Sequence, residues 1–520
     1  MAFLANAAQP AAPLVWIAPS LHRVGMSDPP SSVTKAELSA ARGEYESFQI
    51  IANGGTAGLK NVNVTVSPLQ GPGGAVIAPA NLTLYREKYQ MVTSSSPNWK
   101  GSNQPLAPGW YADALIPFRD PETGKPLSGA KLTAAPFDVK PTNNQPVWVD
   151  VFVPGTATPG QYTGTYTVTS DEGNFTGTID LKVWNFTLPA SPALKSAFLF
   201  FQAGSLAADR ELLRNKVAPL STNPADQALL IKEHGLSATQ AGMFSGADIG
   251  HCSMSPAPPA SFFQKVAAAQ QPALMLYDYS ADEIGHCSNL YPIIREWARN
   301  MHQAGIKNLI TMSPTPALYD DGADRGHSAV DIWVMLPVMY NNSRARVSEV
   351  LKKGDSVWSY NTLVQDAYSP KWLIDFDPIN FRIQPGFISQ SLNLTGMLYW
   401  RVDKWNSDPW NNVNNAGTYS SANYPGEGML VYPGKDVGVP GVVASMRLKW
   451  LRDGVEDYDY VQILKESGKS DLAMEIVKSI APDWTNWTRD SAKVEAAREK
   501  LGEAIEQLRA QAGSNAVGSR

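Results

Sequence analysis

Short hydrophobic runs that alternate with polar residues fill the first third of the chain, and Gly, Pro and Asn separate them. The clearest runs are Glu46–Ala52, Asn63–Ser67, Val147–Val153, Gly160–Thr169 and Thr176–Phe186. A period of two is typical of strands with one buried face, and regularly spaced turn residues are typical of antiparallel sheets. We therefore expect an antiparallel β-sandwich over residues 14–189, followed by a proline-marked linker at Pro189–Pro192.

After the linker, short apolar runs alternate with stretches of helical periodicity, such as Pro224–His234, Tyr291–His302 and Asn342–Lys353. The strand-like runs are Ser196–Gln202, Ser237–Ala241, Ala273–Tyr277, Asn308–Met312, Asp331–Leu336, Ser356–Tyr360 and Gly396–Arg401. Alternating strands and helices predict a parallel sheet, and seven strands with an eighth hidden in 242–272 predict a (β/α)8 TIM-type barrel over 193–442.

Helical periodicity dominates the C-terminal part, beginning with the stretch from Ser445 to Leu464. We expect residues 443–512 to form a helical segment packed on the barrel. The predicted fold class is thus a multidomain β and α/β protein, in line with a length of 520 residues, for which two or three domains are expected.

Composition excludes some classes of partner. The chain has 43 Lys and Arg against 48 Asp and Glu, a net charge of −5, which argues against a nucleic-acid or acidic-membrane partner. It contains no run of 18 apolar residues that would span a membrane. The N-terminus, Met1–Pro10, lacks the features of a signal peptide, and we interpret it as the start of an exported protein, extracellular or periplasmic.

Aromatic residues are abundant, with 15 Trp and 19 Tyr. Flat amphipathic rings suit ligands that have apolar faces and polar edges, as sugars do. An oligosaccharide or glycoconjugate is therefore the expected substrate, with no cofactor. The sequence leaves open whether the protein forms a homo-oligomer.

The candidate catalytic residues are Asp282 and Glu283, which follow the apolar run Ala273–Tyr277 and precede the helix-like stretch at Tyr291. Active sites of α/β barrels lie at the C-terminal ends of the strands. Neighbouring side chains in a strand point to opposite faces, so both carboxylates reach one pocket only where the chain leaves regular strand geometry, as Ser280-Ala281 allows. Adjacent carboxylates raise one pKa, which keeps one protonated while the other stays charged. The alternative is that both cap the following helix.

Aromatic and acidic residues gather near the predicted strand ends and form the candidate substrate-binding set. Each tryptophan taken alone is more typical of a core, but their gathering favours a carbohydrate cleft. The set is Tyr277, Tyr279, His286, Trp333, Trp358, Tyr360, Trp400, Asp403, Trp405 and Trp410.

The two cysteines, Cys252 and Cys287, each follow a histidine. The C-x2–4-C spacing of zinc sites is absent, and adjacent ligands seldom reach one ion, so no metal site is expected. We favour a disulfide between loops of an exported protein over a pair of buried free thiols. A metal-dependent hydrolase using His251, His286 and the cysteines is the remaining alternative.

Four segments of the C-terminal part resemble the signature of glycoside hydrolase family 123 and the related domain of unknown function 4091. They are Leu398–Trp400, Asp408–Trp410, Gly426–Gly434 and Ser445–Tyr458. Upstream, Tyr111–Pro117 resembles the family's Tyr-Pro-Asp-x-Leu segment. Four motifs that occur together and in the same order as in the family are a specific signal of it. With the sandwich included, the similarity runs over most of the chain.

The resemblance implies a β-sandwich followed by a catalytic barrel, and activity as a retaining β-N-acetylgalactosaminidase that acts on chain ends. Carried to this sequence, Asp282 would orient the substrate's 2-acetamido group as its oxygen attacks the anomeric carbon, and Glu283 would act as general acid and then base. One tyrosine among Tyr277, Tyr279 and Tyr360 would hydrogen-bond the acetamido oxygen.

One departure separates this chain from the family. The family commonly has Asp-Glu-Pro where this sequence has Asp282-Glu283-Ile284, so the loop can run differently and bring His286 into the pocket. A shared fold does not fix the substrate. Two alternatives remain: a glycoside hydrolase for another glycan using Asp278, Asp366 or Asp403 as nucleophile or base, and a non-catalytic glycan-binding protein.

Overall fold

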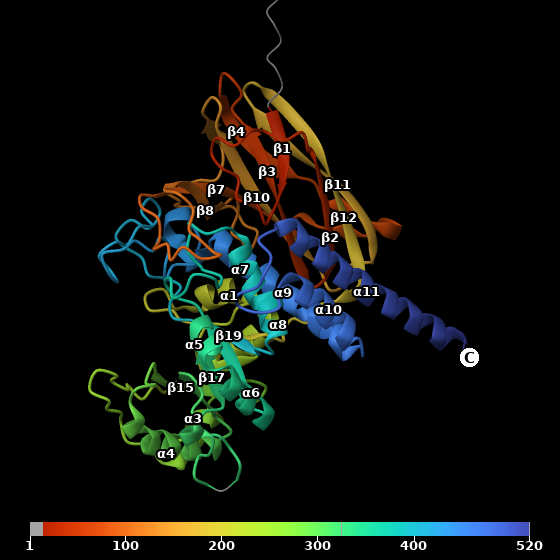
Figure 1. Ribbon diagram of the computed structural model, residues 1–520. Coiled ribbons are helices and arrows are strands. Elements are labelled where there is room, and N and C mark those ends of the chain that lie inside the picture. The colour runs from red at the N-terminus through yellow and green to blue at the C-terminus, as the bar shows by residue number, and fades with distance from the viewer. Residues whose placement is uncertain (1–13, 324, 519–520) are drawn as a thin grey trace, which may run out of the picture.

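The computed structural model describes residues 14–323 and 325–518 (Figure 1). Met1–Pro10, which carried the expectation about the N-terminus, lies outside the described residues. The β-sheets of the N-terminal part lie at one end of the molecule, the parallel strands lie toward the other, and helix α9 (Met446–Glu466) lies between them.

Two sheets form the N-terminal part. The first has the order β1 (Leu14–Pro19), β3 (Glu44–Asn53), β10 (Asn144–Val153), β7 (Leu82–Val92) and β8 (Gly109–Pro117). The second has the order β2 (Lys35–Arg42), β12 (Gly173–Thr187), β11 (Gly160–Ser170), β4 (Leu59–Val66) and β9 (Phe137–Val139). In addition, β5 (Leu69–Gln70) pairs with β11, and β6 (Val76–Ile77) pairs with β5. All pairs are antiparallel except β2 with β12, which is parallel.

Alternation along these strands builds the sandwich core. Ile50 of β3, Val149 of β10, Tyr166 of β11 and Ile179 of β12 are fully buried in one hydrophobic cluster that draws on both sheets. The five strand runs expected from the period-two pattern are therefore confirmed, although β3 and β10 are buried on both faces and not on one alone.

Seven parallel strands form the second large unit. In chain order they are β13 (Lys195–Phe198), β14 (Ala238–Gln240), β15 (Met275–Asp282), β16 (Lys307–Thr311), β17 (Ile332–Met335), β18 (Ser356–Tyr360) and β19 (Gly396–Tyr399). Each pairs with its neighbour in sequence, except that β13 pairs with β19 instead of β14. The sheet therefore curls until its first and second strands lie at the two edges, and all seven expected strands are present.

A short extended segment, residues 218–220, lies in the gap between β13 and β14. Phe198 forms a parallel bridge with Pro219, and the backbone nitrogen of Gln240 donates to the carbonyl of Leu220 at 2.8 Å. The expectation of an eighth strand within 242–272 was wrong: that region holds a loop and helix α3 (Ala260–Ala268). Sequence reasoning missed the bridging segment because Ala218-Pro219-Leu220 is too short for a periodic signal.

Helices and short turns connect the parallel strands. The helices are α1 (Leu206–Arg214), α2 (Pro224–His234), α4 (Tyr291–His302), α5 (Pro337–Asn342) and α6 (Arg344–Lys353), with a continuous run of α7 (Ile379–Ile383), the π-helical turn η5 (Gln384–Ile388) and α8 (Ser389–Ser391) before β19. Two 3-10 turns lie among the parallel strands, η3 (Ser288–Leu290) and η4 (Pro316–Leu318), whereas η1 (Pro72–Gly74) and η2 (Pro79–Asn81) lie in the sandwich and η6 (Gly434–Val437) follows β20. A two-stranded sheet, β20 (Val431–Pro433) with β21 (Val442–Ala444), then leads into α9, α10 (Ser470–Ile480) and α11 (Ser491–Gly518).

Side chains pack the interior of the parallel sheet. Tyr277 of β15 and Trp358 of β18 meet edge to face, with ring centroids 5.8 Å apart. Gly396 of β19 has no side chain because a Cβ there would overlap the indole of Trp358. The sheet encloses a packed core, so a substrate would have to bind at the strand ends.

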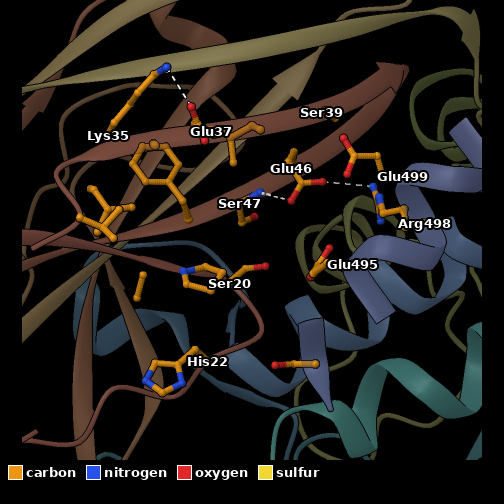
Figure 2. A pocket seen from close by; sticks show the side chains of 18 of the residues that line it. Ser20, His22, Lys35, Glu37, Ser39, Glu46, Ser47, Glu495, Arg498 and Glu499 are labelled. Carbon is orange, nitrogen blue, oxygen red and sulfur yellow. Dashed lines mark hydrogen bonds and ion pairs between the residues drawn. The ribbon is translucent and has the colours of Figure 1, made fainter. Parts of the chain in front are cut away.

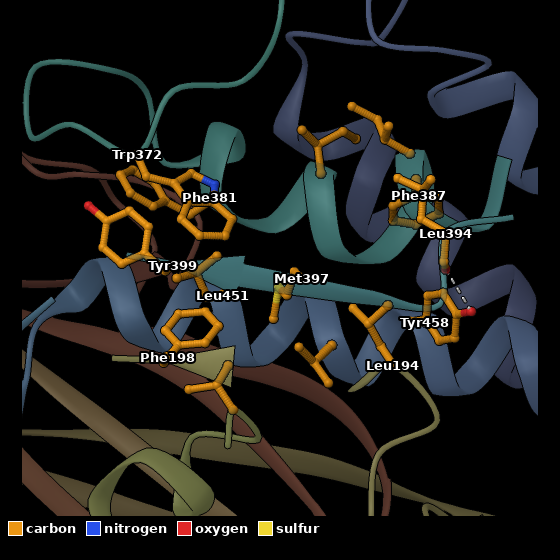
Figure 3. Packing of buried hydrophobic residues seen from close by; sticks show 14 of the residues in the cluster. Leu194, Phe198, Trp372, Phe381, Phe387, Leu394, Met397, Tyr399, Leu451 and Tyr458 are labelled. Atoms are coloured by element: carbon orange, nitrogen blue, oxygen red, sulfur yellow. Dashed lines mark hydrogen bonds between the residues drawn. The ribbon is translucent and has the colours of Figure 1, made fainter. Parts of the chain in front are cut away.

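Helix α9 joins the two units instead of lying only on the parallel sheet. Its Leu451 and Tyr458 pack in one hydrophobic cluster with Met397 and Tyr399 of β19 (Figure 3). The same cluster includes Trp148 of the sandwich. The expectation that the C-terminal helices pack on the barrel is thus incomplete, since α9 is buried against both units.

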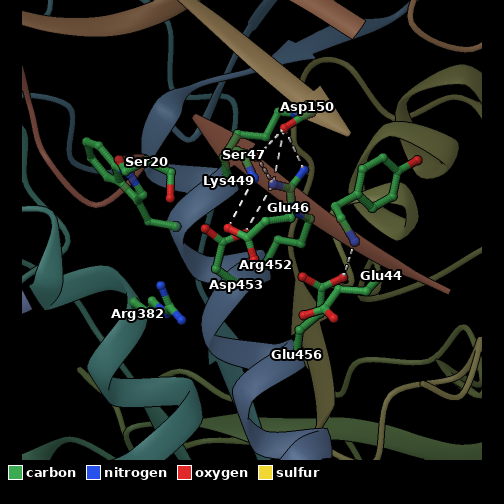
Figure 4. Close-up of polar contacts among 12 residues, drawn as sticks. Ser20, Glu44, Glu46, Ser47, Asp150, Arg382, Lys449, Arg452, Asp453 and Glu456 are labelled. Atoms are coloured by element: carbon green, nitrogen blue, oxygen red, sulfur yellow. Dashed lines mark hydrogen bonds and ion pairs between the residues drawn. The ribbon is translucent and has the colours of Figure 1, made fainter. Parts of the chain in front are cut away.

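Charged residues of α9 are buried at this junction and paired with the sandwich (Figure 4). Asp150 of β10 accepts from Lys449 at 2.8 Å and from Arg452 at 3.2 Å. The cationic neighbours hold the pKa of Asp150 below its ordinary value despite the opposing effect of burial. A buried charge without a partner is costly, so these pairs fix how the two units meet.

The motif that begins at Tyr111 meets the α9 motif at a buried ion pair. Arg447 contacts Asp113 through two nitrogen–oxygen pairs of 2.7 and 3.0 Å, and the hydroxyl of Tyr432 donates to Asp113 at 2.6 Å. Arg447 also donates to the carbonyl of Gly426 at 2.8 Å. These separated sequence motifs therefore share one structural role, which is to lock β8, the 426–434 segment and α9 together.

Candidate active site

A β-bulge places Asp282 and Glu283 at the C-terminal end of β15. Tyr279 pairs with Leu309 of β16 but Ala281 pairs with Ile310, so Ser280 is the extra residue. Glu283 then takes a left-handed backbone conformation, with φ of +50°. Such a conformation is strained for a residue with a side chain, and strained residues concentrate at functional sites. The bulge and the turn provide the break in strand geometry that the sequence required.

Asp282 is exposed and held by two hydroxyl groups. The hydroxyl of Tyr279 donates to Oδ1 of Asp282 at 2.6 Å, and that of Thr311 donates to the same oxygen at 2.5 Å. Because both donors use Oδ1, these bonds orient the carboxylate while leaving Oδ2 for another donor. Burial, and then the charge of Asp282, raise the pKa of Tyr279, so it remains a hydroxyl donor at neutral pH.

Glu283 is exposed and has different partners. Its backbone nitrogen donates to Oγ1 of Thr311 at 2.8 Å, and Tyr360 of β18 donates its hydroxyl to Oε1 at 2.8 Å. Burial, and then the charge of Glu283, raise the pKa of Tyr360. The strand ends of β15, β16 and β18 thus converge on two exposed carboxylates that each retain a free oxygen.

A buried carboxylate, Glu427, lies next to these strand ends. It accepts from Nε1 of Trp400 at 2.6 Å, from the hydroxyl of Thr362 at 3.0 Å and from the nitrogen of Leu363 at 3.0 Å. Burial raises the pKa of Glu427. Thr362 follows Tyr360 by two residues, so the end of β18 and the segment after it connect Glu427 to the Asp282–Glu283 pair. Glu427 also holds the indole nitrogen of Trp400.

The remaining predicted aromatic residues lie in three environments. Tyr277 and Trp358 fill the interior of the parallel sheet. Trp333 is fully buried, donates to Asp355 at 3.1 Å and packs on Tyr319, on the outer side of β17. The third environment is a cleft of about 500 Å³, which Trp405 and Trp410 line together with Gln202.

The other predicted carboxylates have structural partners. Asp403 is fully buried and accepts from the backbone nitrogens of residues 201–203, which holds the segment after β13 against the segment after β19. Asp366 is paired with Lys371 at 3.0 Å. Asp278 lies on β15 with both oxygens buried and unpaired, and burial raises its pKa to about 8. None of the three is exposed beside Glu283 as Asp282 is.

His286 and the cysteines belong to a loop junction. Cys252 and Cys287 form a disulfide with a Cα–Cα distance of 5.2 Å, which confirms the favoured pairing. Nε2 of His286 lies 3.0 Å from the carbonyl oxygen of Ile249. The thiols are therefore not available as thiolate ligands, and His286 faces the loop after β14.

A cleft of about 740 Å³ lies away from the strand ends, between the sandwich and α11 (Figure 2). Its aromatic residues, Trp16, Phe48 and Trp184, are each at most 5% exposed and offer little surface to a ligand. Two of its charged residues, Glu46 and Arg498, are paired at 3.2 Å. We therefore interpret this cleft as a boundary between domains.

Sequence reasoning missed Thr311 and Glu427. Glu427 stood inside the recognised Gly426–Gly434 motif, which was a usable signal. Thr311 gave no such signal, because its role depends on the register of β16 against the bulged β15.

Two family models match the chain. The model of the glycoside hydrolase 123 catalytic domain matches residues 317–464, and that of the glycoside hydrolase 123 N-terminal domain matches residues 25–170. Asp282 and Glu283 lie between the two matched ranges. No curated protein matches the chain.

Solved structures also resemble it. A family 123 glycoside hydrolase from Clostridium perfringens, described for glycolipid glycan hydrolysis, has a TM-score of 0.66 at 13% identity, over 98% of this chain and 100% of that chain. A β-glucuronidase from Parabacteroides merdae has a TM-score of 0.29 at 10% identity, over 80% and 50%. An endo-β-1,4-mannanase from Thermotoga petrophila has a TM-score of 0.29 at 10% identity, over 52% and 77%. The similarity to the Clostridium perfringens protein shows the fold. The other two similarities support no conclusion about fold or function.

Proposed function

Because two models of glycoside hydrolase family 123 match and together span more than half of it, the chain belongs to that family and is a glycoside hydrolase, and we propose that it removes β-linked 2-acetamido sugars of the N-acetylgalactosamine type from glycan ends. The reaction would retain the anomeric configuration through participation of the substrate's own acetamido group. The observation that carries the proposal is the pair of exposed carboxylates at the end of β15, each oriented by a different tyrosine.

The geometry suits different roles for the two carboxylates. Asp282, already fixed through Oδ1, has Oδ2 available to accept the acetamido N–H and turn the acetamido oxygen toward the anomeric carbon. That oxygen attacks as the glycosidic bond breaks, and Glu283 gives its proton to the leaving oxygen. Glu283 then takes a proton from water as the water attacks the same carbon, which restores the acetamido group.

Glycolipid glycans are the proposed substrates, in keeping with the description of the Clostridium perfringens protein. Trp400, whose indole nitrogen donates to Glu427, is the proposed sugar-stacking surface among the aromatic residues at the strand ends. Residues 14–323 and 325–518 include no helix with the length and apolarity to cross a membrane.

We also propose the finer organisation expected from the sequence. With segment 218–220 counted as a strand, the parallel sheet has the eight members of a (β/α)8 barrel, and Asp282 and Glu283 end the fourth. The units would be the sandwich at 14–189, the barrel at 193–442 and the helical segment at 443–512. The disulfide supports an exported protein, since such bonds persist in oxidising compartments.

Hydrolysis of a panel of 4-nitrophenyl glycosides tests the proposal. Wild type should cleave the β-N-acetylgalactosaminide, and Glu283→Gln should lose at least about a hundredfold in kcat, the usual contribution of a general acid. Glu296→Gln, an exposed carboxylate on α4, is the matched control and should retain wild-type rates. Cleavage of sugars without a 2-acetamido group, or full activity of Glu283→Gln, would contradict the mechanism.

A further inference from the structure

The loop after β14, residues 242–259, is fastened to the segment that carries Asp282 and Glu283. We call it the wall loop. Its Ser245 hydroxyl donates to the carbonyl of Ser280, and Cys252 is joined to Cys287. The side chain of Asn289 donates to the carbonyl of Cys252 at 2.8 Å. The wall loop is therefore held in place beside the bulge of β15 at several separate points.

Phe244 of the wall loop presents an aromatic ring at the candidate active site. The ring meets Tyr279 edge to face, with centroids 5.7 Å apart, and Tyr279 donates to Asp282. Although it makes this contact, Phe244 is 48% exposed, and Ile249 of the same loop is 41% exposed. An exposed aromatic ring beside convergent polar groups is typical of the lining of a ligand-binding pocket.

The chemistry of an N-acyl group indicates what Phe244 would contact. In the proposed reaction Asp282 accepts the acetamido N–H, and the acyl methyl is attached to the same carbonyl carbon as that nitrogen. A group that binds the N–H therefore has the methyl as its near neighbour. Phe244 provides an apolar surface against Tyr279, which donates to Asp282, so its ring would close the space into which a longer acyl chain would extend.

We propose that Phe244, held by the disulfide-bonded wall loop, determines the size of the N-acyl group that the enzyme accepts. This inference rests on the proposed function, because it requires an N-acyl sugar at Asp282. It assigns to this chain's own loop a specificity role that Asp282 and Glu283 do not have.

Aryl β-galactosaminides carrying N-acetyl, N-propanoyl or N-butanoyl groups provide the test. Wild type should disfavour N-propanoyl by about tenfold or more in kcat/KM, the usual effect of one methylene in a closed pocket. Phe244→Ala should reduce that ratio to about threefold or less, and Phe244→Trp should increase it beyond the wild-type ratio. An unchanged ratio in both variants would overturn the inference.

Phe201→Ala is the matched control. Phe201 follows β13, is 63% exposed and packs against Arg401, without contact to Tyr279. It should keep the wild-type acyl preference. If it relaxed the preference as much as Phe244→Ala, the selectivity would not belong to Phe244 and the inference would fail.

A Cys252→Ser, Cys287→Ser double variant tests the role of the wall loop. Release of the loop should relax the acyl preference in the same direction as Phe244→Ala. Retention of the full wild-type preference would refute the role assigned to the disulfide. Failure of the proposed function looks different, since wild type would then cleave no member of the N-acyl series; cleavage that Glu283→Gln abolishes, with a ratio insensitive to Phe244, would refute the inference alone.

Discussion

Single hydroxyl groups decide how the two candidate catalytic carboxylates are presented. Tyr360 and Tyr279 are predicted site residues from different strands, and each touches one member of the pair. The tyrosines could be selected from the sequence because they end apolar runs, but their assignment to separate carboxylates depends on the bulge at Ser280. The sequence left the choice among three tyrosines open, and Tyr277 instead donates its hydroxyl to the carbonyl of Leu220 at 2.9 Å.

Removal of the Tyr360 hydroxyl should impair catalysis more than binding. Tyr360→Phe deletes the donor 2.8 Å from Glu283, and hydrogen bonds to charged groups contribute about 1.5–3 kcal/mol. We expect kcat on an aryl β-N-acetylgalactosaminide to fall about tenfold or more, with KM within about threefold. Steady-state kinetics checks this, and a rise in KM with unchanged kcat would assign Tyr360 to substrate binding.

Glu87 of β7 makes stability depend on pH. It is fully buried with both carboxylate oxygens unpaired, and burial raises its pKa from 4.5 to about 8. Between these pH values the folded state therefore holds a proton that the unfolded state has released. The stability that comes from this protonated carboxyl is fully present below pH 4.5 and is lost as the pH rises to about 8.

Glu87→Gln should remove this loss. We expect the variant to exceed wild type in free energy of unfolding by several kcal/mol near pH 9, on the order of 4 kcal/mol, and to match it near pH 4. Denaturant unfolding at a series of pH values measures the difference. Glu296→Gln, which changes an exposed glutamate, should follow the wild-type profile; a gap between Glu87→Gln and wild type that did not widen with pH would count against a buried neutral Glu87.

At the scale of elements, the sequence located the seven parallel strands and five strands of the sandwich, but not the remaining strands or how the elements close on one another. The five sandwich strands were predictable from their period of two, and the seven parallel strands from short continuous apolar runs. Segment 218–220 and the bulge in β15 were not, since both arise from hydrogen bonds to strands that are distant in sequence. Helix α9 was predictable as a helix. Its burial on all sides was not, because its sequence contains many charged residues, which are usually exposed, and here they are buried and paired.

Close packing of α9 on the α7–η5 helix depends on Gly454. A Cβ at this position would collide with the carbonyl oxygen of Arg382 and lie 2.6 Å from Cγ of Pro385. Gly454→Ala should therefore lower the free energy of unfolding by about 1–3 kcal/mol, although alanine is the better helix former by about 1 kcal/mol. Denaturant titration checks this. Glu466→Ala, at an exposed position of the same helix, should change stability by less than about 0.5 kcal/mol, and equal stability of Gly454→Ala would mean that the helices can move apart.

At the scale of the whole molecule, buried charges join the sandwich to the parallel sheet through α9. Asp150 is the centre of this junction, with contacts to Lys449, Arg452 and the hydroxyl of Ser47. These are long-range pairs that no local pattern reveals, which is why the sequence predicted the units and not the contacts that join them.

Asp150→Asn should weaken the whole fold. Loss of the carboxylate leaves Lys449 buried without its anion and leaves Arg452 with Asp453 alone, and breaking a buried pair typically costs 3–5 kcal/mol. Asp138→Asn breaks the exposed pair with Lys60 and should have no measurable effect on unfolding. Differential scanning calorimetry of both variants tests this, and a separate early transition in Asp150→Asn, with the rest unchanged, would show that the units are independent.

The pairing of β13 with β19 has a consequence for how the chain acquires its structure. Lys195 lies opposite Gly396, about 200 residues later, so the first strand of the parallel sheet has no partner on one edge until most of the protein has been synthesised. At 5–20 residues per second this interval lasts on the order of 10–40 s. Throughout it an apolar strand edge is open to other chains, so aggregation during synthesis should depend more on the rate of elongation through residues 195–396 than on the stability of the finished enzyme.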